Sequence, residues 1–288
     1  MAFFNYIEID RVEKLTKEAF IDNYYNLQKP LVITNQVDDW PAVHKWSFKF
    51  LKEIAGDKIV PLYNSGIAEC IPKLNEPDLT LPMSQYIEIL QRGPTDLRIF
   101  LYNLMKDVPD LKTDIRWPEL GIKLIKTLPF IFFGGQGTKV YMQYDIDLSN
   151  IFDIHFEGKK QCILVTPNEA QYIYRLPYSW ICHENIDFDN PDFEKFPALE
   201  MITPYITNLE HGEMLYIPEG WWYYMKYTTP GFSLRLKALA GRPKNLLKGI
   251  RNMTIMQYYD NWMRQYKGQA WLNYKNRESI RRTNATLK

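Results

Sequence analysis

The pattern of apolar and polar residues along the chain predicts alternating helices and strands in its first third. Three segments have apolar residues at three- and four-residue spacing, and the first two begin at a Thr or Ser that suits a helix N-cap. We therefore expect helices at 16–27, 47–55 and 83–90. Short apolar runs at 31–35 and 97–104 are expected to be strands.

Between residues 130 and 240 the pattern changes to short apolar and aromatic runs separated by Gly, Pro, Asn and Asp. Many short strands with turns between them are typical of a sandwich or a barrel. The acidic, turn-rich segment 184–200 interrupts these runs and is expected to be a long loop that packs on its own aromatic residues.

Beyond Pro243 the periodicity is helical again. Apolar residues that recur at three- and four-residue steps are expected to share one helix face: Leu246, Ile250, Met253, Met256, Tyr259, Met263 and Tyr266. We divide the chain accordingly into N-terminal helical and strand elements (1–125), a barrel core (126–242) and a C-terminal helical segment (243–288).

The composition excludes several classes of protein. A net charge of +1 gives no indication of a nucleic-acid or membrane partner, and no stretch of eighteen apolar residues predicts a transmembrane helix. The first fifteen residues lack the uninterrupted apolar region of a signal peptide, so we expect a cytoplasmic protein. Cys70, Cys162 and Cys182 form no CxxC pair and are expected to be free thiols.

Two segments carry candidate chemistry. The first is Gln143-Tyr144-Asp145, near the end of a predicted strand, and the second runs from Gly212 to Tyr223 (GEMLYIPEGWWY). Residues at i and i+2 of a strand point to the same side, so two metal ligands can be placed there and a third supplied by a distant strand. Non-haem Fe(II) oxygenases use two imidazoles and one carboxylate in this way.

These segments, with three others in the same order, resemble the JmjC-type cupin-like family of 2-oxoglutarate oxygenases, and within it the asparaginyl hydroxylases. The other similar segments are KPLVI (29–33), DWPA (39–42) followed by Trp46, and DFDNPDFEKFP (187–197). The resemblance extends from about residue 29 to 240. It implies a mainly β fold, the double-stranded β-helix or cupin jelly roll, with helices before and after it. It also implies Fe(II) and 2-oxoglutarate as cofactors, a small-molecule or peptide ligand in the barrel, and a homodimer built through the C-terminal helix.

The resemblance assigns the three metal positions to Gln143, Asp145 and Tyr223. Asp145 matches the carboxylate ligand, whereas Gln143 and Tyr223 stand where the two imidazoles belong. A neutral amide is a poor ligand for Fe(II), and a phenol with a reference pKa of about 10 must lose a proton before it binds well. The metal site is therefore degenerate by sequence.

The resemblance also implies residues for the co-substrate. Lys160 matches the lysine that pairs with the 2-oxoglutarate carboxylate, Asn150 matches the asparagine that follows the metal pair, and Lys237 falls near the co-substrate. Tyr141 and Trp222 are expected to line the same cavity. The alternatives are that Lys160 is a solvated surface lysine and that Tyr223 is a core aromatic residue.

No histidine is expected to replace the missing imidazoles. His183 and His211 lie in turn-like sequence, and none of the four histidines has the i, i+2 relation to Asp145. His155 has the opposite parity to Lys160, so it is expected to point away from the cavity if Lys160 points into it.

Three functions remain open from the sequence. The first is a catalytically impaired relative that acts as a binding or regulatory module. The second is an active 2-oxoglutarate-dependent hydroxylase with an unusual Gln/Asp/Tyr site or another metal. The third is metal-independent chemistry with Tyr223 or Lys160 as the acid or base.

Overall fold

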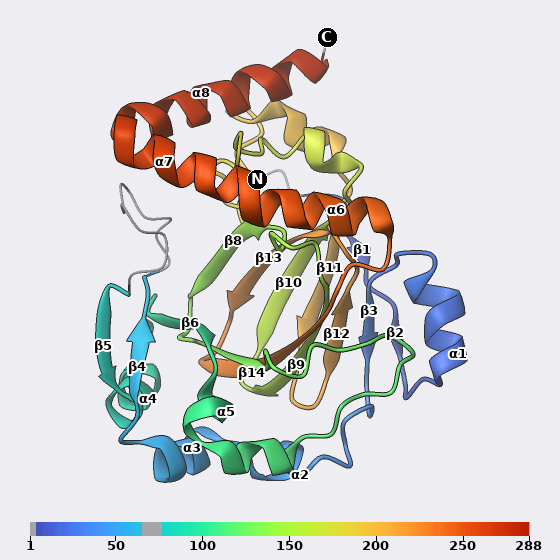
Figure 1. Ribbon diagram of the computed structural model, residues 1–288, viewed down its shortest axis with the longest axis vertical. Coiled ribbons are helices and arrows are strands. Elements are labelled where there is room, and N and C mark those ends of the chain that lie inside the picture. Colours follow the sequence, from blue (N-terminus) through green and yellow to red (C-terminus); the bar gives the residue numbers. More distant parts are fainter. Residues whose placement is uncertain (1–3, 65–76, 288) are drawn as a thin grey trace.

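The computed structural model describes residues 4–64 and 77–287. Within these ranges the strands form a five-stranded sheet, a seven-stranded sheet and a separate two-stranded sheet (Figure 1). The five-stranded sheet has the order β1 (Ile7–Glu8), β11 (Tyr205–Leu209), β10 (Lys160–Val165), β13 (Trp222–Tyr227), β8 (Lys139–Gln143). The seven-stranded sheet has the order β2 (Arg11–Val12), β3 (Leu31–Ile33), β12 (Met214–Ile217), β9 (Asn150–Glu157), β14 (Gly231–Ala238), β7 (Phe130–Gly134), β6 (Arg98–Tyr102). The third sheet pairs β4 (Ile59–Leu62) with β5 (Leu79–Pro82).

The two large sheets face each other and enclose an apolar core. Strand alternation places one set of side chains between the sheets, including Val32 and Leu215 from the larger sheet and Leu164 and Met225 from the smaller one. The fold is therefore mainly β, the expected cupin jelly roll with helices at both ends. The first 125 residues supply strands to both sheets, because β1 joins the smaller one and β2, β3 and β6 join the larger one.

N-terminal helices cover the outer face of the larger sheet. Phe20 packs against Phe152 and Trp46 against Phe156, with ring centroids 5.8 and 4.9 Å apart. The helices begin where the sequence predicts, since the Thr16 and Ser47 hydroxyls accept hydrogen bonds from backbone N–H groups three residues later. Their bounds are α1 (Lys17–Phe20) with the π-helical η1 (Ile21–Tyr25), α2 (Pro41–Lys45), α3 (Phe48–Ala55), α4 (Met83–Arg92), α5 (Leu104–Asp107) and the 3₁₀ turn η2 (Pro109–Asp114).

The segment between β10 and β11 covers the outer face of the smaller sheet. It contains the expected loop and two 3₁₀ turns, η3 (Glu169–Gln171) and η4 (Pro197–Met201). Phe188 and Phe196 of the expected loop are buried, and the rings of Tyr174 and Phe196 are 5.0 Å apart. The ring contacts of the loop 184–200 are with residues outside it, such as Tyr174 and Tyr224, rather than among its own aromatic residues.

The C-terminal segment forms one long helix followed by a second. The long helix comprises α6 (Pro243–Arg251), the π-helical η5 (Asn252–Met256) and α7 (Gln257–Lys267), and the second is α8 (Gln269–Asn284) with the 3₁₀ turn η6 (Ala285–Leu287). The periodic apolar residues do not share one face, because Ile250, before the π-helical turn, is exposed whereas Met263, after it, is buried. A π-turn adds a residue and so shifts the helix face.

Cys162 and Cys182 are free and buried, and Cys70 lies outside the described residues. No helix in the described part of the chain has the length and apolar character needed to span a bilayer.

Candidate functional site

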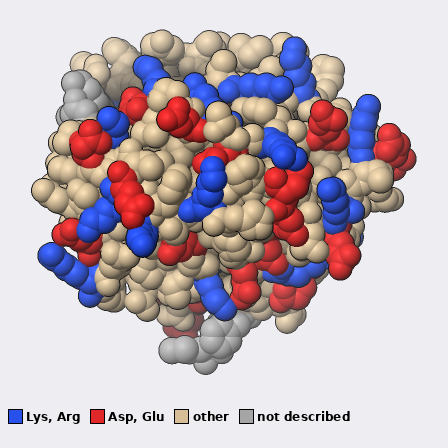
Figure 2. Space-filling view, turned by 90° about the horizontal axis from the view of Figure 1, so that it is seen from below, with Lys and Arg blue, Asp and Glu red and all other residues tan. Residues whose placement is uncertain are grey.

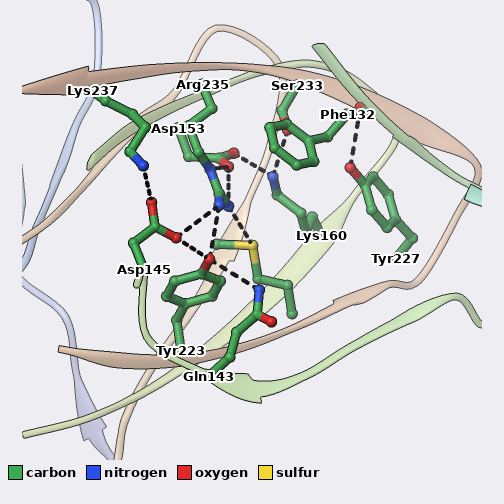
Figure 3. A network of polar contacts seen from close by, with 11 residues as sticks. Phe132, Gln143, Asp145, Asp153, Lys160, Tyr223, Tyr227, Ser233, Arg235 and Lys237 are labelled. Atoms are coloured by element: carbon green, nitrogen blue, oxygen red, sulfur yellow. Dashed lines mark hydrogen bonds and ion pairs between the residues drawn. The ribbon is translucent and has the colours of Figure 1, made fainter. Parts of the chain in front are cut away.

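The register between β8 and β13 determines the geometry of the site. Tyr223 lies directly opposite Gln143 in this antiparallel pair, and a bulge follows between Tyr223 and Met225. The chain continues from Gln143 through Tyr144 to Asp145, whose carboxylate points to the same interior position (Figure 3). The structure thus brings together the three residues that the sequence assigns to the metal positions.

The phenol oxygen of Tyr223 lies at the centre of this group. It accepts hydrogen bonds from Gln143 Nε2 at 3.1 Å and from Arg235 Nη1 at 3.0 Å. It donates its own proton to Asp145 Oδ1 at 2.6 Å. Burial, followed by the charge of Asp145, raises the pKa of Tyr223 far above its ordinary value, so the phenol keeps its proton.

The second oxygen of Asp145 is also engaged. Lys237 Nζ lies 2.8 Å from Asp145 Oδ2 and 2.8 Å from Asp147 Oδ2, and so bridges the two carboxylates. Burial opposes ionisation of Asp145, but Lys237 and Arg235 outweigh it and lower the pKa of this carboxyl. Asp145 is therefore an ionised carboxylate whose charge Lys237 and Arg235 already balance.

A second ion-pair cluster adjoins the first through Arg235. The guanidinium donates from Nε and Nη2 to Asp153 Oδ2, at 3.3 and 3.1 Å. Asp153 in turn binds Lys160, whose ammonium also donates to Ser233 Oγ at 2.8 Å. Burial raises the pKa of Asp153, but the charges of Lys160 and Arg235 outweigh this effect and lower the pKa to about 2. Lys160 is fully buried, so its interpretation as a surface lysine is wrong.

The ion pairs form one continuous network. It contains three cations (Lys160, Arg235 and Lys237) and three anions (Asp145, Asp147 and Asp153), so its formal charge is zero. Buried charges are tolerated when they are paired and hydrogen-bonded. Protein side chains alone therefore balance the charges of the network.

Little space remains beside the network. Arg98, Gln143, Asp153, Lys160 and Arg235 help to line a cavity of about 20 Å³. Such a volume holds about one water molecule, whereas small-molecule sites are typically roughly 300 Å³ or larger. The buried Arg98 Nε has no hydrogen-bond partner among the described residues, and a water molecule in this cavity would supply one.

Not every residue assigned to the site lies there. Asn150 is on the opposite face of β9, where it accepts from Tyr216 OH at 2.9 Å and donates to Leu239 O at 3.2 Å. Trp222 points outward and packs on Tyr144, with centroids 4.8 Å apart. Tyr141 is not among the residues that line the small cavity.

The sequence analysis missed Asp153 and Arg235, and its parity argument for His155 is wrong. Asp153 and His155 alternate with Phe152 and Ile154, which face the N-terminal helices. His155 therefore lies on the interior side, with its ring 6.3 Å from that of Tyr227. In the sequence Asp153 and Arg235 each have a polar neighbour two residues away, at 155 and at 233, which places each pair on one face of its strand without indicating that this face points inward.

His155 cannot stand in for a missing ligand near Asp145. It is fully buried, neither ring nitrogen has a hydrogen-bond partner among the described residues, and burial followed by the charge of Lys160 lowers its pKa to about 3. It is not among the residues around the phenol oxygen of Tyr223. His155 is therefore a neutral core histidine.

The residues present do not fit Fe(II). The phenol oxygen of Tyr223 already makes three hydrogen bonds, and both oxygens of Asp145 are occupied by donors. The nearest guanidinium nitrogen of Arg235 lies 3.9 Å from Asp145 Oδ1, so a cation already occupies the neighbourhood of this carboxylate. In the described part of the chain, no group of three or more His, Cys, Asp or Glu side chains is arranged to hold a metal.

The residues do not fit 2-oxoglutarate either. The ammonium of Lys160, which the resemblance assigns to the co-substrate carboxylate, is neutralised by Asp153. The adjoining cavity of about 20 Å³ leaves no room for a dicarboxylate. The side chains that the resemblance assigns to both cofactors are thus already paired with other protein side chains.

Comparisons with known proteins agree with the fold. A family model described as "Cupin-like domain" matches residues 16–264. The chain is 28% identical over 239 residues to "tRNA wybutosine-synthesizing protein 5" of Homo sapiens, covering 76% of this chain and 73% of the relative. It is 29% identical over 238 residues to "Lysine-specific demethylase JMJ30" of Arabidopsis thaliana, covering 78% of this chain and 54% of the relative. It is 28% identical over 225 residues to "Lysine-specific demethylase 8" of Xenopus tropicalis, covering 75% of this chain and 49% of the relative.

Proposed function

This chain belongs to the cupin-like domain family, whose JmjC-type members are related to 2-oxoglutarate oxygenases, and we propose that it does not carry out their iron chemistry. The jelly roll instead acts as a binding or regulatory module. Fold alone does not determine function, so the proposal rests on the site.

One observation carries the proposal. The Tyr223 hydroxyl is bonded to Gln143, Asp145 and Arg235, so both lone pairs of the phenol oxygen accept hydrogen bonds and its proton is donated to Asp145. A hydroxyl offers one donor and two acceptor positions, and all three are used. Replacing these bonds by bonds to a metal would leave the Arg235 guanidinium buried beside a second cation, which is costly at short range.

The runner-up is an active 2-oxoglutarate-dependent hydroxylase with a Gln/Asp/Tyr metal site. Its support is the family membership and the names of the relatives, a lysine-specific demethylase and a tRNA wybutosine-synthesizing protein. The third hypothesis, acid–base catalysis by Tyr223 or Lys160, has less support. Tyr223 is buried in hydrogen bonds and Lys160 in an ion pair, and the adjoining cavity is too small for a substrate.

An assay of 2-oxoglutarate consumption tests the proposal. With Fe(II), ascorbate and 2-oxoglutarate supplied, we expect the unaltered protein to release no more CO₂ than a sample without protein. The variant Gln143→His/Tyr223→His/Arg235→Leu serves as the comparison, because it supplies two imidazoles and removes the competing cation. Steady turnover by the unaltered protein would overturn the proposal in favour of the hydroxylase.

The proposed module is a cytoplasmic homodimer. Large apolar side chains on the long C-terminal helix are exposed to solvent, among them Leu247, Tyr258, Trp262 and Tyr266. Contiguous exposed apolar surface of this kind supports a protein interface. The free, buried thiols of Cys162 and Cys182 support a reducing compartment.

A further inference from the structure

A second, much larger cavity lies outside the jelly roll. It has a volume of about 840 Å³ and is bounded by the segment 171–179, by α6 to α7 and by the end of α8, near the top of Figure 1. This volume is in the range of small-molecule sites, which is roughly 300 to 1,000 Å³. The cavity is separate from the ion-pair network, because none of the six charged residues of that network lines it.

The charges around this cleft are unbalanced. Arg175, Lys248, Arg251 and Arg282 line it, and no Asp or Glu does. Arg282 pairs with Glu278 outside the cleft. The other three cations, Arg175, Lys248 and Arg251, have no carboxylate partner in the described ranges. Burial, together with the charges of Arg175 and Arg251, lowers the pKa of Lys248. An anion would relieve this repulsion.

One wall of the cleft is aromatic. The rings of Tyr178 and Tyr259 are 4.9 Å apart, and Trp271 supports that of Tyr178 at 5.8 Å. Tyr178 is 45% exposed, so part of its ring remains open to a ligand. Its backbone has a φ of 54°, in the left-handed region that residues other than Gly, Asn and Asp seldom adopt. Such a conformation persists only where the surrounding structure enforces it.

Another face of the molecule lacks such a charge imbalance. Figure 2 views the molecule from below relative to Figure 1, and basic and acidic side chains intermingle across that face. The uncompensated cations of the cleft are therefore not part of a general excess of positive charge, since the net charge of the chain is only +1. Their combination with aromatic rings in one concave site indicates a ligand with both an anionic group and a flat ring.

We propose that the cleft between the segment 171–179 and the C-terminal helices binds a nucleotide, with its phosphates on Arg175, Lys248 and Arg251 and its base against Tyr178 and Tyr259. Guanidinium groups bind phosphate oxygens in bidentate fashion, and aromatic side chains stack on any base. The nucleotide is either free or part of a single-stranded RNA, since both present the same chemistry. This site is independent of the proposed loss of iron chemistry, which concerns the barrel interior.

Isothermal titration calorimetry with ADP, adenosine, inorganic phosphate and a short single-stranded RNA tests the proposal. We expect ADP to bind the unaltered protein at least tenfold more tightly than adenosine or phosphate alone. Arg175→Gln/Arg251→Gln should weaken ADP binding at least tenfold, and Tyr178→Asn, which suits the left-handed backbone, should weaken it about threefold. Lys267→Gln is the matched control, because Lys267 is exposed on α7 but does not line the cleft.

The RNA titration identifies the source of the ligand. RNA binding at least tenfold tighter than that of ADP, and equally sensitive to Arg175→Gln/Arg251→Gln, assigns the cleft to RNA. RNA binding no tighter than that of ADP assigns it to a free nucleotide. The proposal is overturned if neither ADP nor RNA binds, if adenosine binds as tightly as ADP, or if Lys267→Gln weakens binding as much as the cleft variants do.

Discussion

The phenol oxygen of Tyr223 links its neighbouring side chains by ordinary hydrogen bonds. In an oxygenase barrel, a metal ion links the side chains at the corresponding position. Here the phenol oxygen connects Gln143 and Asp145 on one side of the site to Arg235 on the other. Each of these partners would be left with an unsatisfied polar group if the hydroxyl were removed. At the scale of single residues, Tyr223 is therefore expected to contribute strongly to stability.

We predict that Tyr223→Phe lowers the free energy of unfolding by about 2 kcal/mol, because it leaves a buried carboxylate oxygen and two buried donors unpaired. Urea denaturation followed by circular dichroism measures this difference. Tyr274→Phe is the control, since Tyr274 is 38% exposed on α8, outside the proposed dimer interface, and it should change stability by less than about 0.5 kcal/mol. Equal effects of the two substitutions would contradict the role assigned to the hydroxyl.

His155 is expected to make the protein sensitive to acid. Its pKa is lowered to about 3 in the folded protein, against an ordinary value of 6.5, so the unfolded chain binds a proton that the folded chain does not. Stability from this residue is fully present above pH 6.5 and is lost as the pH falls toward 3, by about 1.4 kcal/mol per pH unit.

The variant His155→Leu removes this proton uptake without breaking a hydrogen bond. Relative to the unaltered protein, we predict that the variant gains about 2 kcal/mol in unfolding free energy between pH 6.5 and pH 4.5. Urea unfolding at a series of pH values measures the difference, and comparison at pH 7.5 gives the effect of packing alone. Parallel pH curves for the two proteins would show that His155 is not the residue responsible.

At the scale of elements, most strands of the barrel core were predictable, whereas β11, the order of the strands in the sheets and the faces of some strands and helices were not. The motif spacing correctly placed Gln143, Asp145 and Tyr223 together, because an i, i+2 pair and a strand register fix their positions. The parity argument failed for His155 because a turn at Gly158 separates β9 from β10. Gly158 has a φ of 78°, and a Cβ there would lie 2.1 Å from Pro230 O.

Asp153 and Arg235 were missed for a related reason. Both lie in strands whose other residues are mostly apolar, and strand alternation alone gives no indication that charged side chains point inward. Only the three-dimensional pairing of β9 with β14, which sets Asp153 opposite Arg235, shows that they neutralise each other. The π-turn at Asn252–Met256 had a similar effect on the helix, because it changed which residues share a face.

The packing of α7 on α8 depends on one buried carboxylate. Asp260 accepts from Lys275 Nζ at 2.6 Å, from Trp271 Nε1 at 2.8 Å and from Arg264 Nε at 2.8 Å. We predict that Asp260→Asn destabilises this helix pair by about 3 kcal/mol, because two buried cations lose their partner. Hydrogen exchange of the α7 and α8 amides measures the change.

The matched control is Asp57→Asn, whose ion pair with Lys58 lies at the surface and should contribute less than about 1 kcal/mol. Faster exchange confined to α7 and α8 in Asp260→Asn is the expected result. Unchanged exchange in these helices would show that the carboxylate does not hold them together.

At the scale of the whole molecule, the exposed apolar residues of the long helix predict a dimer. We expect sedimentation equilibrium at micromolar concentration to give twice the chain mass of 34.3 kDa. Trp262→Glu places a charge in the proposed interface and should weaken association at least tenfold. Leu27→Glu, at an exposed apolar residue remote in sequence, should leave it unchanged. A monomeric unaltered protein would contradict the dimer.

In the barrel as a whole, charge pairs lie at the positions that the resemblance assigns to a metal and an acidic co-substrate. Lys160 and Asp153 lie on one side of Arg235, and Asp145, Lys237 and Asp147 lie on the other, so this network is neutral and little space remains beside it. Restoring two imidazoles alone leaves the cation of Arg235 beside the metal position. We therefore expect Gln143→His/Tyr223→His to bind a divalent metal at least tenfold more weakly than the same variant that also carries Arg235→Leu.

Titration with Mn(II), followed by electron paramagnetic resonance, tests the central claim most directly, because it reports metal binding without requiring turnover. For the unaltered protein, we predict a spectrum of free Mn(II) at every concentration up to about 1 mM. The oxygen atoms of Tyr223 and Asp145 that could bind the metal already make hydrogen bonds and ion pairs. The triple variant Gln143→His/Tyr223→His/Arg235→Leu should show bound Mn(II) under the same conditions. One Mn(II) bound per chain at micromolar concentration by the unaltered protein would contradict the account.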